Sequence, residues 1–530
     1  MDLVSFAFDV QAHYDPEKPL YISAENPSIS LNASQMNTLV KQLVAGFQAA
    51  GLRKGEAVLL CVPNNCFYVA LILGIIGAGG VFCGVNPAYQ LDELVHIAEI
   101  ASPRLVVVSK DIFPMVSRMC EMKGIPNDRI FLLEDLTVPD YPQDLLFSLD
   151  GKREVINDGN RTTGHPSDLQ NHGQLPWSTL HDETVLRDTP AAYFSTSGTT
   201  GLPKLASLSH YSLIAQHRSL FENVPYEVVR LACLPFFHIF GAAWAVFCPL
   251  KYGEPVYIMP RFSLDNYTSN IFKYAITETY MAPPMVYELI QCERPLQQLL
   301  STIKYVGIGG APIDAESLSR FRSNLQPGAT VTPVWGMTEF GPAALFRWGE
   351  HDDTGSIGRL IEGYDMKLVD SAGTLILADN QPGELLIRSP GIMTGYLGYP
   401  THDEGDFFRT GDIAQVNEKK LHIVGRSKEL IKVKGWQVAP AEIEAIILQH
   451  PDILDCAVVG ILSADHVTEL PRAYVVGRNG RKESVLGEEI YNLVRSRLVS
   501  YKKLAGGVTF LERIPRTPSG KVQRFKLFSL

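Results

Sequence analysis

The stretch from Tyr193 to Lys204 gathers the side chains that a phosphate-binding loop needs. It reads Tyr-Phe-Ser-Thr-Ser-Gly-Thr-Thr-Gly-Leu-Pro-Lys, with five serine and threonine hydroxyls, two glycines and a lysine. Glycines let backbone N–H groups turn toward one centre, hydroxyls add donors, and the lysine adds a positive charge. The spacing differs from the mononucleotide-binding loop Gly-x-x-x-x-Gly-Lys-Ser/Thr, and a polar surface loop has a similar composition. Because the stretch follows an apolar run and ends in Pro-Lys, we expect a polyphosphate site rather than a linker.

A single histidine, His238, lies in the apolar run from Leu234 to Gly241. In such surroundings a histidine is more often a buried structural residue than a catalytic one. The residues of this run alone leave both interpretations open.

The segment from Val334 to Gly341 combines an aromatic ring, a hydroxyl and a carboxylate. Trp335 could stack on a base, Thr338 could bind a phosphate, and Glu339 could bind Mg²⁺. Mg²⁺ is held by one or two carboxylates together with phosphate oxygens, so a single glutamate suffices. A strand that ends in a turn beside a packed tryptophan would give the same pattern without any ligand.

Three later segments add a carboxylate and several cations. Arg409–Asp412 places a carboxylate on a tight turn, where it could accept both ribose hydroxyls, although Thr-Gly-Asp is also a common turn. Lysines alternate along residues 428–437, as on the solvated face of an edge strand. Lys521 lies in a basic loop that could be only a solvated turn near the chain end. A cation there would stabilise the charge that develops when a carboxylate attacks a phosphate, and a second domain must deliver it because Lys204 is distant in sequence.

Helices and strands alternate along the first part of the chain. Apolar residues at helical spacing predict a helix over 31–50, and residues 57–62 predict a buried strand. A strand at 81–85, a helix at 92–99 and a strand at 104–108 follow. Such alternation favours parallel sheets with helices on both faces.

The polar residues 148–185 predict a surface loop or linker, after which the α/β pattern resumes. The elements expected next are strands at 228–234 and 253–259, a helix near 285–291, and strands at 303–306, 367–369 and 383–388. Near residue 427 the pattern becomes α+β, with a helix from Pro440 to about Gln449 and strands at 456–460 and 473–477. We therefore expect an α/β fold: a large N-terminal domain of stacked α/β sheets (1–427) followed by a small mobile α+β domain (428–530).

The composition is that of an ordinary globular protein, because 46% of the 530 residues are hydrophobic and 20% are charged. The net charge of −10 argues against nucleic acid as a partner. Eight cysteines without a C-x-x-C pair favour reduced thiols over disulfides or zinc. The apolar runs 68–85 and 231–250 are interrupted by glycines or prolines and are expected to be buried elements rather than membrane spans. Residues 1–31 lack a secretory pattern and the terminal Phe-Ser-Leu is a poor peroxisomal address, so we expect a cytoplasmic protein.

In this order the segments resemble those of the adenylate-forming enzymes. Ser-Gly-Thr-Thr-Gly-Leu-Pro-Lys is similar to the phosphate loop of that superfamily, which includes acyl- and aryl-CoA ligases, peptide-synthetase adenylation domains and beetle luciferases. The most specific match is the run from Lys428 to Glu444, and the resemblance spans about residues 30–526. It is closest to the acyl- and aryl-CoA ligases similar to 4-coumarate–CoA ligase. The resemblance implies activation of a small carboxylic acid by ATP and Mg²⁺ as an acyl-adenylate, and then acyl transfer to coenzyme A.

The resemblance also implies a role for each candidate site residue. It implies these catalytic residues: Lys521, His238 and Lys432. It implies these ATP-binding residues: Thr196, Ser197, Gly198, Thr199, Thr200, Lys204, Trp335, Gly336, Thr338, Asp412, Arg426 and Lys428. It implies these acyl-pocket residues: His238, Phe240, Gly309, Gly310, Met337 and Gly341. It implies Lys434 and Gly435 for coenzyme A and Glu339 for the metal.

Within the implied ATP site, Trp335 would lie against adenine, Thr338 would touch the α-phosphate, and Asp412 and Arg426 would contact the ribose. Lys428 would be the hinge between the domains. In the thioester-forming orientation the region around Lys432, rather than Lys521, would face the active site.

Departures from the family pattern bear on the acid. The position near His238 where peptide-synthetase domains have an aspartate is not acidic, which argues against an α-amino acid. Phe240 stands where hydroxycinnamate ligases tend to have tyrosine, Leu205 follows the loop lysine where glycine is common, and Ile308 stands where serine is usual. An apolar, fairly roomy pocket for an aryl or medium-chain acid is expected from these residues: Phe240, Ala242, Ala243, Trp244, Gly310, Phe340 and Gly341.

Three alternatives stay open. The acyl group could pass to an external acyl carrier protein, since the chain has no carrier domain of its own. An unrelated nucleotide-dependent kinase is disfavoured because the mononucleotide-binding motif is missing. A non-catalytic adenylate-binding protein is disfavoured because the candidate residues for every step are present.

Overall fold

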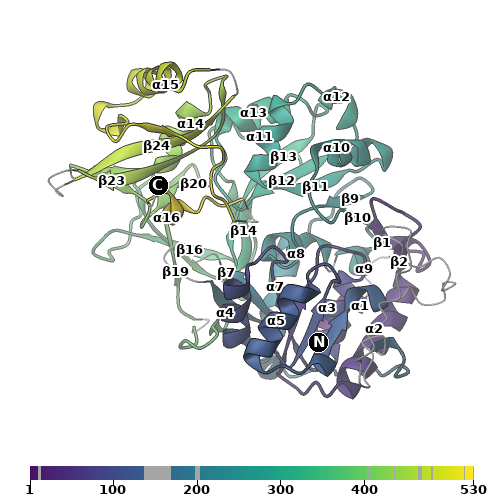
Figure 1. Cartoon of the computed structure of the whole chain (residues 1–530). Coiled ribbons are helices and arrows are strands. Elements are labelled where there is room, and N and C mark those ends of the chain that lie inside the picture. Colours follow the sequence, from purple (N-terminus) through teal and green to yellow (C-terminus); the bar gives the residue numbers. More distant parts are fainter. Residues whose placement is uncertain are drawn as a thin grey trace.

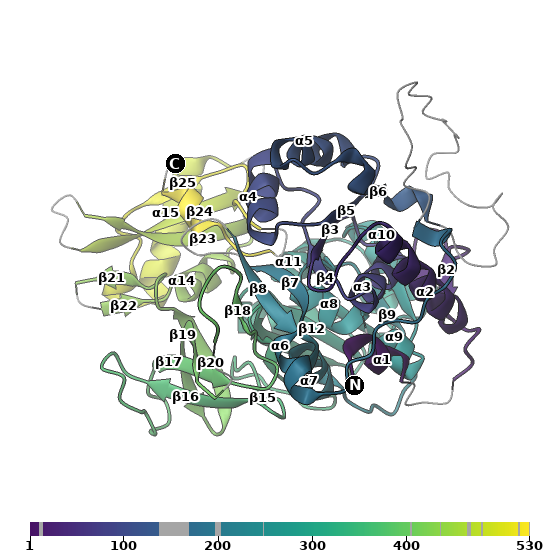
Figure 2. The same ribbon diagram turned by 90° about the horizontal axis from the view of Figure 1, so that it is seen from below.

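The structure is a computed structural model that describes residues 1–9, 14–136, 169–196, 203–246, 248–402, 405–434, 436–463, 468–478, 481–517 and 520–528. Figure 1 shows the purple and blue N-terminal elements at the lower right and the yellow-green C-terminal elements together at the upper left. Teal elements from the middle of the chain lie between and beside them, and Figure 2 shows the same grouping from below.

One sheet has seven strands in the order β18-β8-β7-β4-β3-β5-β6. Its strands are β3 (Ala57–Cys61), β4 (Val81–Gly84), β5 (Leu105–Val108), β6 (Ile130–Leu132), β7 (Pro190–Thr196), β8 (Lys204–Ser209) and β18 (Gly395–Tyr396). The strands from β7 to β6 run parallel, and β8 pairs antiparallel with β7 and β18. β3, β4 and β5 are entirely buried, as expected for parallel strands covered on both faces. The helices before and between them are α2 (Ala33–Ala49), α3 (Tyr68–Gly77), α4 (Leu91–Ala101) and α5 (Phe113–Lys123).

A second sheet has nine strands in the order β15-β14-β13-β12-β11-β9-β10-β1-β2. They are β1 (Pro19–Ser23), β2 (Ser30–Asn32), β9 (Arg230–Ala232), β10 (Val256–Ile258), β11 (Glu278–Met281), β12 (Tyr305–Gly309), β13 (Thr330–Met337), β14 (Gly341–Leu345) and β15 (Arg359–Leu360). The other α-helices before residue 323 are α1 (Leu3–Phe8), α6 (Glu183–Asp188), α7 (His210–Leu220), α8 (Ile239–Ala245), α9 (Cys248–Tyr252), α10 (Leu264–Lys273), α11 (Pro283–Gln291), α12 (Leu296–Leu299) and α13 (Ala315–Arg322).

The chain then forms an antiparallel sheet in the order β16-β17-β19-β20 and a separate C-terminal group. The four strands are β16 (Asp365–Val369), β17 (Gly383–Arg388), β19 (Phe408–Asn417) and β20 (Lys420–Arg426). The C-terminal group consists of the hairpin β21 (Ile431–Val433) and β22 (Trp436–Val438), the sheet β23 (Ile453–Leu462), β24 (Glu469–Gly477) and β25 (Val508–Phe510), and the helices α14 (Pro440–Ile447), α15 (Glu483–Arg497) and α16 (Arg524–Leu527). No strand pairing among the described residues joins this group to the earlier sheets.

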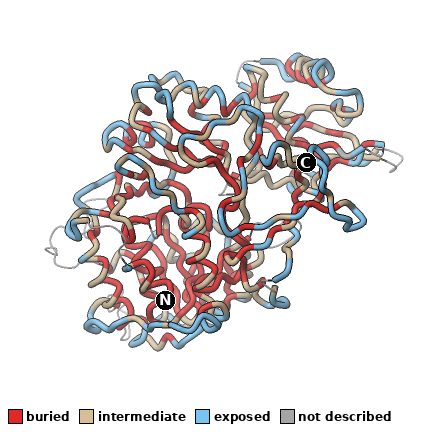
Figure 3. The backbone as a smooth tube through the Cα atoms, turned by 180° about the vertical axis from the view of Figure 1, so that it is seen from behind, coloured by how far each residue is buried: buried red, intermediate tan, exposed pale blue. Residues whose placement is uncertain are grey.

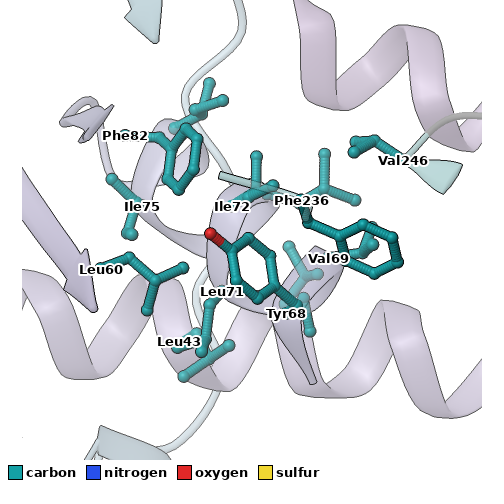
Figure 4. Close-up of a cluster of buried hydrophobic side chains, with 14 of the residues drawn as sticks. Leu43, Leu60, Tyr68, Val69, Leu71, Ile72, Ile75, Phe82, Phe236 and Val246 are labelled. Atoms are coloured by element: carbon teal, nitrogen blue, oxygen red, sulfur yellow. The ribbon is translucent and has the colours of Figure 1, made fainter. Parts of the chain in front are cut away.

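The core of the two sheets falls into three clusters of buried side chains. One joins residues of β3, β4, β7 and β8 to residues of β1, β2 and β10, a second lies on β9 and β11–β14, and the third lies on the other face of β3–β5. Figure 3 shows the buried residues along the chain in red. Figure 4 shows part of the first cluster, with Tyr68 of α3 packed among Leu43, Leu60 and Phe236 from three other segments. α3 approaches α2 closely because Gly74 faces Leu43, whose Cβ would lie 2.6 Å from any Cβ at position 74. A glycine at this helix contact therefore sets the distance between the helices.

The predicted elements are confirmed, with small shifts of their ends. The strand expected at 303–306 is β12 (Tyr305–Gly309), and the helix opened by Pro440 ends at Ile447, two residues before the expected Gln449. Most of the predicted 148–185 loop lies outside the described residues, and its last three residues begin α6 instead, because the Asp182 side chain caps that helix. The α/β fold with a large N-terminal part of several sheets and a small C-terminal part is confirmed, whereas the boundary at 427/428 stays a prediction. Over the described ranges, no helix is both long and apolar enough to cross a membrane.

Candidate active site

The predicted phosphate loop connects β7 to β8. Thr196, the last residue of β7, is buried and pairs with Lys204, the first residue of β8. Residues 197–202, which include Ser197, Gly198, Thr199 and Thr200, lie outside the described part of the chain. Lys204 Nζ lies over two tyrosine rings, 4.8 Å from the centre of Tyr396 and 4.5 Å from that of Tyr399. The lysine is therefore held beside β18 and the residues that follow it by cation–π contacts.

The carboxylate of Glu339 lies beside Tyr396, one of the two tyrosines that contact Lys204. Glu339 is only 5% exposed, and its Oε1 accepts a hydrogen bond from the Tyr396 hydroxyl at 2.5 Å. Burial and the neighbouring Glu339 raise the pKa of Tyr396, so its hydroxyl stays protonated and donates. Tyr396 thus touches both the loop lysine and the candidate metal ligand. No cluster of three or more metal-binding side chains occurs among the described residues, and a single carboxylate of this kind fits Mg²⁺ bound mainly through phosphate oxygens.

The predicted nucleoside residues meet around Asp412. Its Oδ2 accepts a hydrogen bond from Trp335 Nε1 at 2.9 Å, and its Oδ1 lies 2.6 Å from Arg426 Nε. Asp412 is 3% exposed, and burial raises its pKa despite the opposing effect of Arg426. The carboxylate is consequently fixed in place by two residues that sequence analysis assigned to the same nucleotide.

Lys521 reaches this site from the C-terminal group. It lies in a small hairpin in which Thr517 N–H donates to the Lys521 carbonyl at 2.7 Å, and Arg516 Nη1 donates to the Gly520 carbonyl at 2.7 Å. Arg516 also forms an ion pair with Asp455 of β23 at 2.6 Å, which ties the hairpin to its own domain.

Gly520 then packs against the start of α11, where a Cβ would lie 3.3 Å from Ala282 Cβ and from Pro284 Cδ. Burial is the main reason why the pKa of Lys521 is lowered, with Arg426 adding to the effect and Glu339 and Asp412 opposing it. Lys521 therefore lies among the predicted nucleotide and metal residues.

His238 caps the N-terminus of α8 and lies near the positive charge of Lys521. Its Nδ1 accepts a hydrogen bond from the Phe240 N–H at 3.3 Å. Burial, together with repulsion from Lys521, lowers the pKa of His238 to about 3. The ring is therefore neutral at physiological pH. Because Nδ1 is an acceptor, the proton is on Nε2, which is free to act as a donor to a reacting carboxylate.

Small residues and aromatic rings form the surroundings of the predicted acyl pocket. A Cβ at Gly309 would lie 2.8 Å from the Val334 carbonyl oxygen and 2.9 Å from Phe240 Cζ, so only glycine fits between β13 and α8. Gly341 has a φ of +71°, and a side chain there would meet Gln216. Gly310 also has a positive φ, and Met337 is half-buried at the end of β13.

The remaining predicted residues are distributed as follows. Thr338 is buried directly after β13, and Gly336 packs tightly against Gly341 and Pro342. The side chains of Lys428, Lys432 and Lys434 are exposed. The backbone N–H groups of Lys432 and Lys434 donate to Glu469 and Thr468 of the C-terminal group. Gly435 lies outside the described residues.

Sequence reasoning missed Tyr396, Tyr399, Gln216 and the Arg516–Asp455 pair. Gln216 Nε2 donates to the Gly391 carbonyl at 2.7 Å and so connects α7 to the segment that leads into β18. The only local signal for Tyr396 was a Gly-Tyr step, which is common. The contacts with Glu339 and Lys204 depend on the pairing of β18 with β8, and the sequence gives no sign of that pairing.

Comparison with known proteins identifies the family. Residues 8–397 match the AMP-binding enzyme family, and residues 442–521 match the AMP-binding enzyme C-terminal domain. A nicotinic acid-CoA ligase of Penicillium canescens is 43% identical over 100% of this chain and 97% of that protein. A phenylacetyl-CoA ligase of Aspergillus niger is 40% identical over 98% of this chain and 95% of that protein. The ATP-bound RpMatB-BxBclM chimera B1 has a similar structure, with a TM-score of 0.84 at 25% identity over 99% of this chain and 98% of that one. The chain belongs to the AMP-binding, adenylate-forming enzymes.

Proposed function

We propose that the protein is an AMP-forming ligase that joins an aromatic or medium-chain carboxylic acid to coenzyme A. The observation that carries the proposal is the position of Lys521, which a C-terminal hairpin brings beside His238, Glu339 and Asp412. Relatives at about 40% identity over the full chain are named as CoA ligases for nicotinic and phenylacetic acids, which supports both the reaction and the substrate class.

In the first half-reaction, a carboxylate oxygen of the acid attacks the α-phosphorus of ATP and pyrophosphate leaves. Asp412, held by Trp335 and Arg426, would bind the ribose and so fix the nucleotide. The Nε2–H of His238 would orient the attacking carboxylate, and Lys521 would stabilise the charge on the phosphate. Mg²⁺, when bound at Glu339, would neutralise the phosphate oxygens.

In the second half-reaction, the thiol of coenzyme A attacks the acyl carbonyl, and AMP leaves with the bonding electrons of the anhydride oxygen. We propose that the domain of residues 428–530 rotates for this step, with Lys428 as hinge. Lys428 is exposed in the turn that follows β20, and the described sheets on its two sides share no strands. Lys521 would then leave the site, and Lys432, Lys434 and Gly435 would approach coenzyme A. An external acyl carrier protein is the alternative acceptor.

The test is acid-dependent release of pyrophosphate from ATP over a panel of aryl, fatty and amino acids, with and without coenzyme A. We expect release that requires an aryl or medium-chain acid and increases with coenzyme A. Release that coenzyme A does not accelerate would favour the carrier-protein alternative, and absence of release with every acid would refute the proposal.

Lys521→Ala should strongly impair release but spare thioester formation from supplied acyl-AMP. Lys526→Ala, an exposed lysine on the adjoining helix α16, is the matched control and should affect neither step. Equal loss of both half-reactions in Lys521→Ala would refute the rotation.

A further inference from the structure

Trp244 of α8 is a buried residue with an unsatisfied polar atom. Its side chain is 8% exposed, and no described protein atom accepts a hydrogen bond from its Nε1–H. A buried N–H without an acceptor is costly, and most such groups in folded proteins are paired with protein or water. Among the described residues, nothing uses this hydrogen-bond donor.

The position of Trp244 relates this donor to the acyl pocket. Trp244 follows Phe240 by four residues, so both side chains lie on the same face of α8. The Trp244 ring stacks on Tyr280 with centroids 4.1 Å apart, and Tyr280 also meets the Phe240 ring edge-on at 6.4 Å. Phe240 in turn closes on Gly309. The three aromatic rings thus form a wall behind Gly309, one to two helical turns from the carboxylate end of the pocket at His238.

A cavity lies directly at this wall. It has a volume of about 20 Å³ and is lined on α8 by Gly241, Trp244 and Ala245 and on the facing strands by residues that include Leu231 of β9 and Tyr280 of β11. A space of this size holds about one water or one non-hydrogen atom of a ligand.

The charged group that borders the cavity is already paired. Arg230 forms ion pairs with Glu254 and, at 3.0 Å, with Glu278, and all three side chains are largely buried. These opposite charges satisfy one another, so the cavity does not present an isolated charge to a ligand. A neutral acceptor that matches an indole N–H fits this setting better than a charged group does.

We propose that Trp244 selects the acid: its indole N–H donates to an acceptor atom on the ring of a compact aromatic carboxylic acid, remote from the carboxylate. The inference rests on the proposed ligase function and narrows its substrate class. The aromatic wall limits the length of the acid, and the N–H distinguishes a ring with an acceptor from the same ring without one. Such sites reject analogues that lack the acceptor because the buried donor then stays unpaired.

The wild-type test uses acids of nearly equal shape. Benzoate has no ring acceptor, nicotinate and isonicotinate have a ring nitrogen remote from the carboxylate, and picolinate has it next to the carboxylate. We expect kcat/KM for nicotinate or isonicotinate to exceed that for benzoate by about tenfold or more, as expected for one hydrogen bond of this kind. Picolinate should gain nothing over benzoate.

The variants test whether Trp244 is the cause. Trp244→Phe should bring the pyridine-to-benzoate ratio close to one. Replacement of Trp244 by benzothienylalanine, which keeps the two-ring shape and has sulfur in place of N–H, should do the same without opening a cavity. Trp348→Phe is the matched control, because Trp348 has another buried Nε1 without a partner and packs against Tyr226, away from the pocket. It should leave the ratio unchanged.

The outcomes separate this inference from the proposed function. If wild-type enzyme activates benzoate and the pyridine acids equally, or prefers medium-chain acids, the role of Trp244 is refuted while the ligase function stands. The same holds if benzothienylalanine preserves the ratio or if Trp348→Phe lowers it equally. If no acid releases pyrophosphate, the ligase function itself fails and the inference fails with it.

Discussion

The hydroxyl of Tyr396 offers a test of how the candidate metal site is built. Tyr396 donates to Glu339 at 2.5 Å while its ring supports Lys204, so one side chain connects two residues that would bind the same phosphates. Tyr396→Phe removes the donor and keeps the ring. Adenylation should therefore weaken through Glu339 alone, with the support of Lys204 unchanged.

The size of the effect follows from the burial of Glu339. A hydrogen bond to a charged group is worth about 1.5–3 kcal/mol, and Glu339 is only 5% exposed, so that water compensates poorly. If most of this energy orients Glu339 in the transition state, kcat/KM for adenylation should fall about 10- to 100-fold, since each ~1.4 kcal/mol corresponds to a factor of ten. The Mg²⁺ concentration for half-maximal rate should also rise by about tenfold, because the loosened carboxylate is the proposed ligand.

The assay is the initial rate of pyrophosphate release at fixed ATP over a series of Mg²⁺ concentrations. Tyr399→Phe is the matched control, because the Tyr399 ring also lies over Lys204 but its side chain is 56% exposed. Tyr399→Phe should retain the wild-type Mg²⁺ dependence. An unchanged Mg²⁺ dependence in Tyr396→Phe, or an equal change in Tyr399→Phe, would show that the contact with Glu339 does not organise the metal site.

Three further predictions concern the pocket, the hairpin and acid stability. Gly309→Ala should raise KM for the acid and lower the melting temperature, because its Cβ would lie 2.8 Å from the Val334 carbonyl oxygen; unchanged values would contradict this packing. Asp455→Asn should slow adenylation more than thioester formation from acyl-AMP. Arg516 then loses its ion pair with residue 455, and the hairpin that carries Lys521 is no longer anchored to β23. Equal slowing of both steps would argue against this role. Burial lowers the pKa of three histidines from 6.5 to about 4 or about 3, so the unfolded chain binds more protons below pH 6.5 and stability should fall toward pH 4. Near pH 5 the free energy of unfolding would change by up to about 4 kcal/mol per pH unit. Buried carboxyl groups with raised pKa would reduce this slope. Urea unfolding that gives the same free energy of unfolding at pH 7 and pH 5 would contradict the prediction. The histidines are His210, His217 and His238.

The parts of the site that sequence analysis predicted share one property: each is carried by a short local motif. Trp335, Asp412 and Arg426 come from three separate motifs, and the structure brings Trp335 and Arg426 each within hydrogen-bonding distance of the Asp412 carboxylate. The chemistry of these motifs could be predicted because an aromatic N–H, a carboxylate or a guanidinium at a tight turn or strand end has few roles. The alternation of helices and strands predicted the parallel sheet for a similar reason, since buried parallel strands are continuous apolar runs.

The parts that were missed depend on register between distant segments. Tyr396 reaches Glu339 because β18 pairs with β8, the strand that begins at Lys204, and two residues of strand give no periodic signal. The aromatic wall was missed as well, because the stacking of Trp244 on Tyr280 requires α8 to lie across β11. Sequence analysis named Trp244 as one residue of an apolar pocket, and its stacking on Tyr280 could not be predicted from the sequence.

The contact between the Lys521 hairpin and the large domain can form and break without changing the shape of the hairpin. The hairpin is anchored to its own domain by the Arg516–Asp455 ion pair and by a hydrogen bond from Arg516 to Gly520, so its shape does not depend on the large domain. It meets the large domain through Gly520, which has a φ of +83° and presents no side chain to Ala282 and Pro284. The charged form of Lys521 is subject to opposing effects. Glu339 and Asp412 favour it, whereas burial and Arg426 disfavour it. A bound polyphosphate would shift this balance toward the closed position, and its departure would remove that stabilisation. On this argument, release of pyrophosphate would be the event that favours the rotation proposed above.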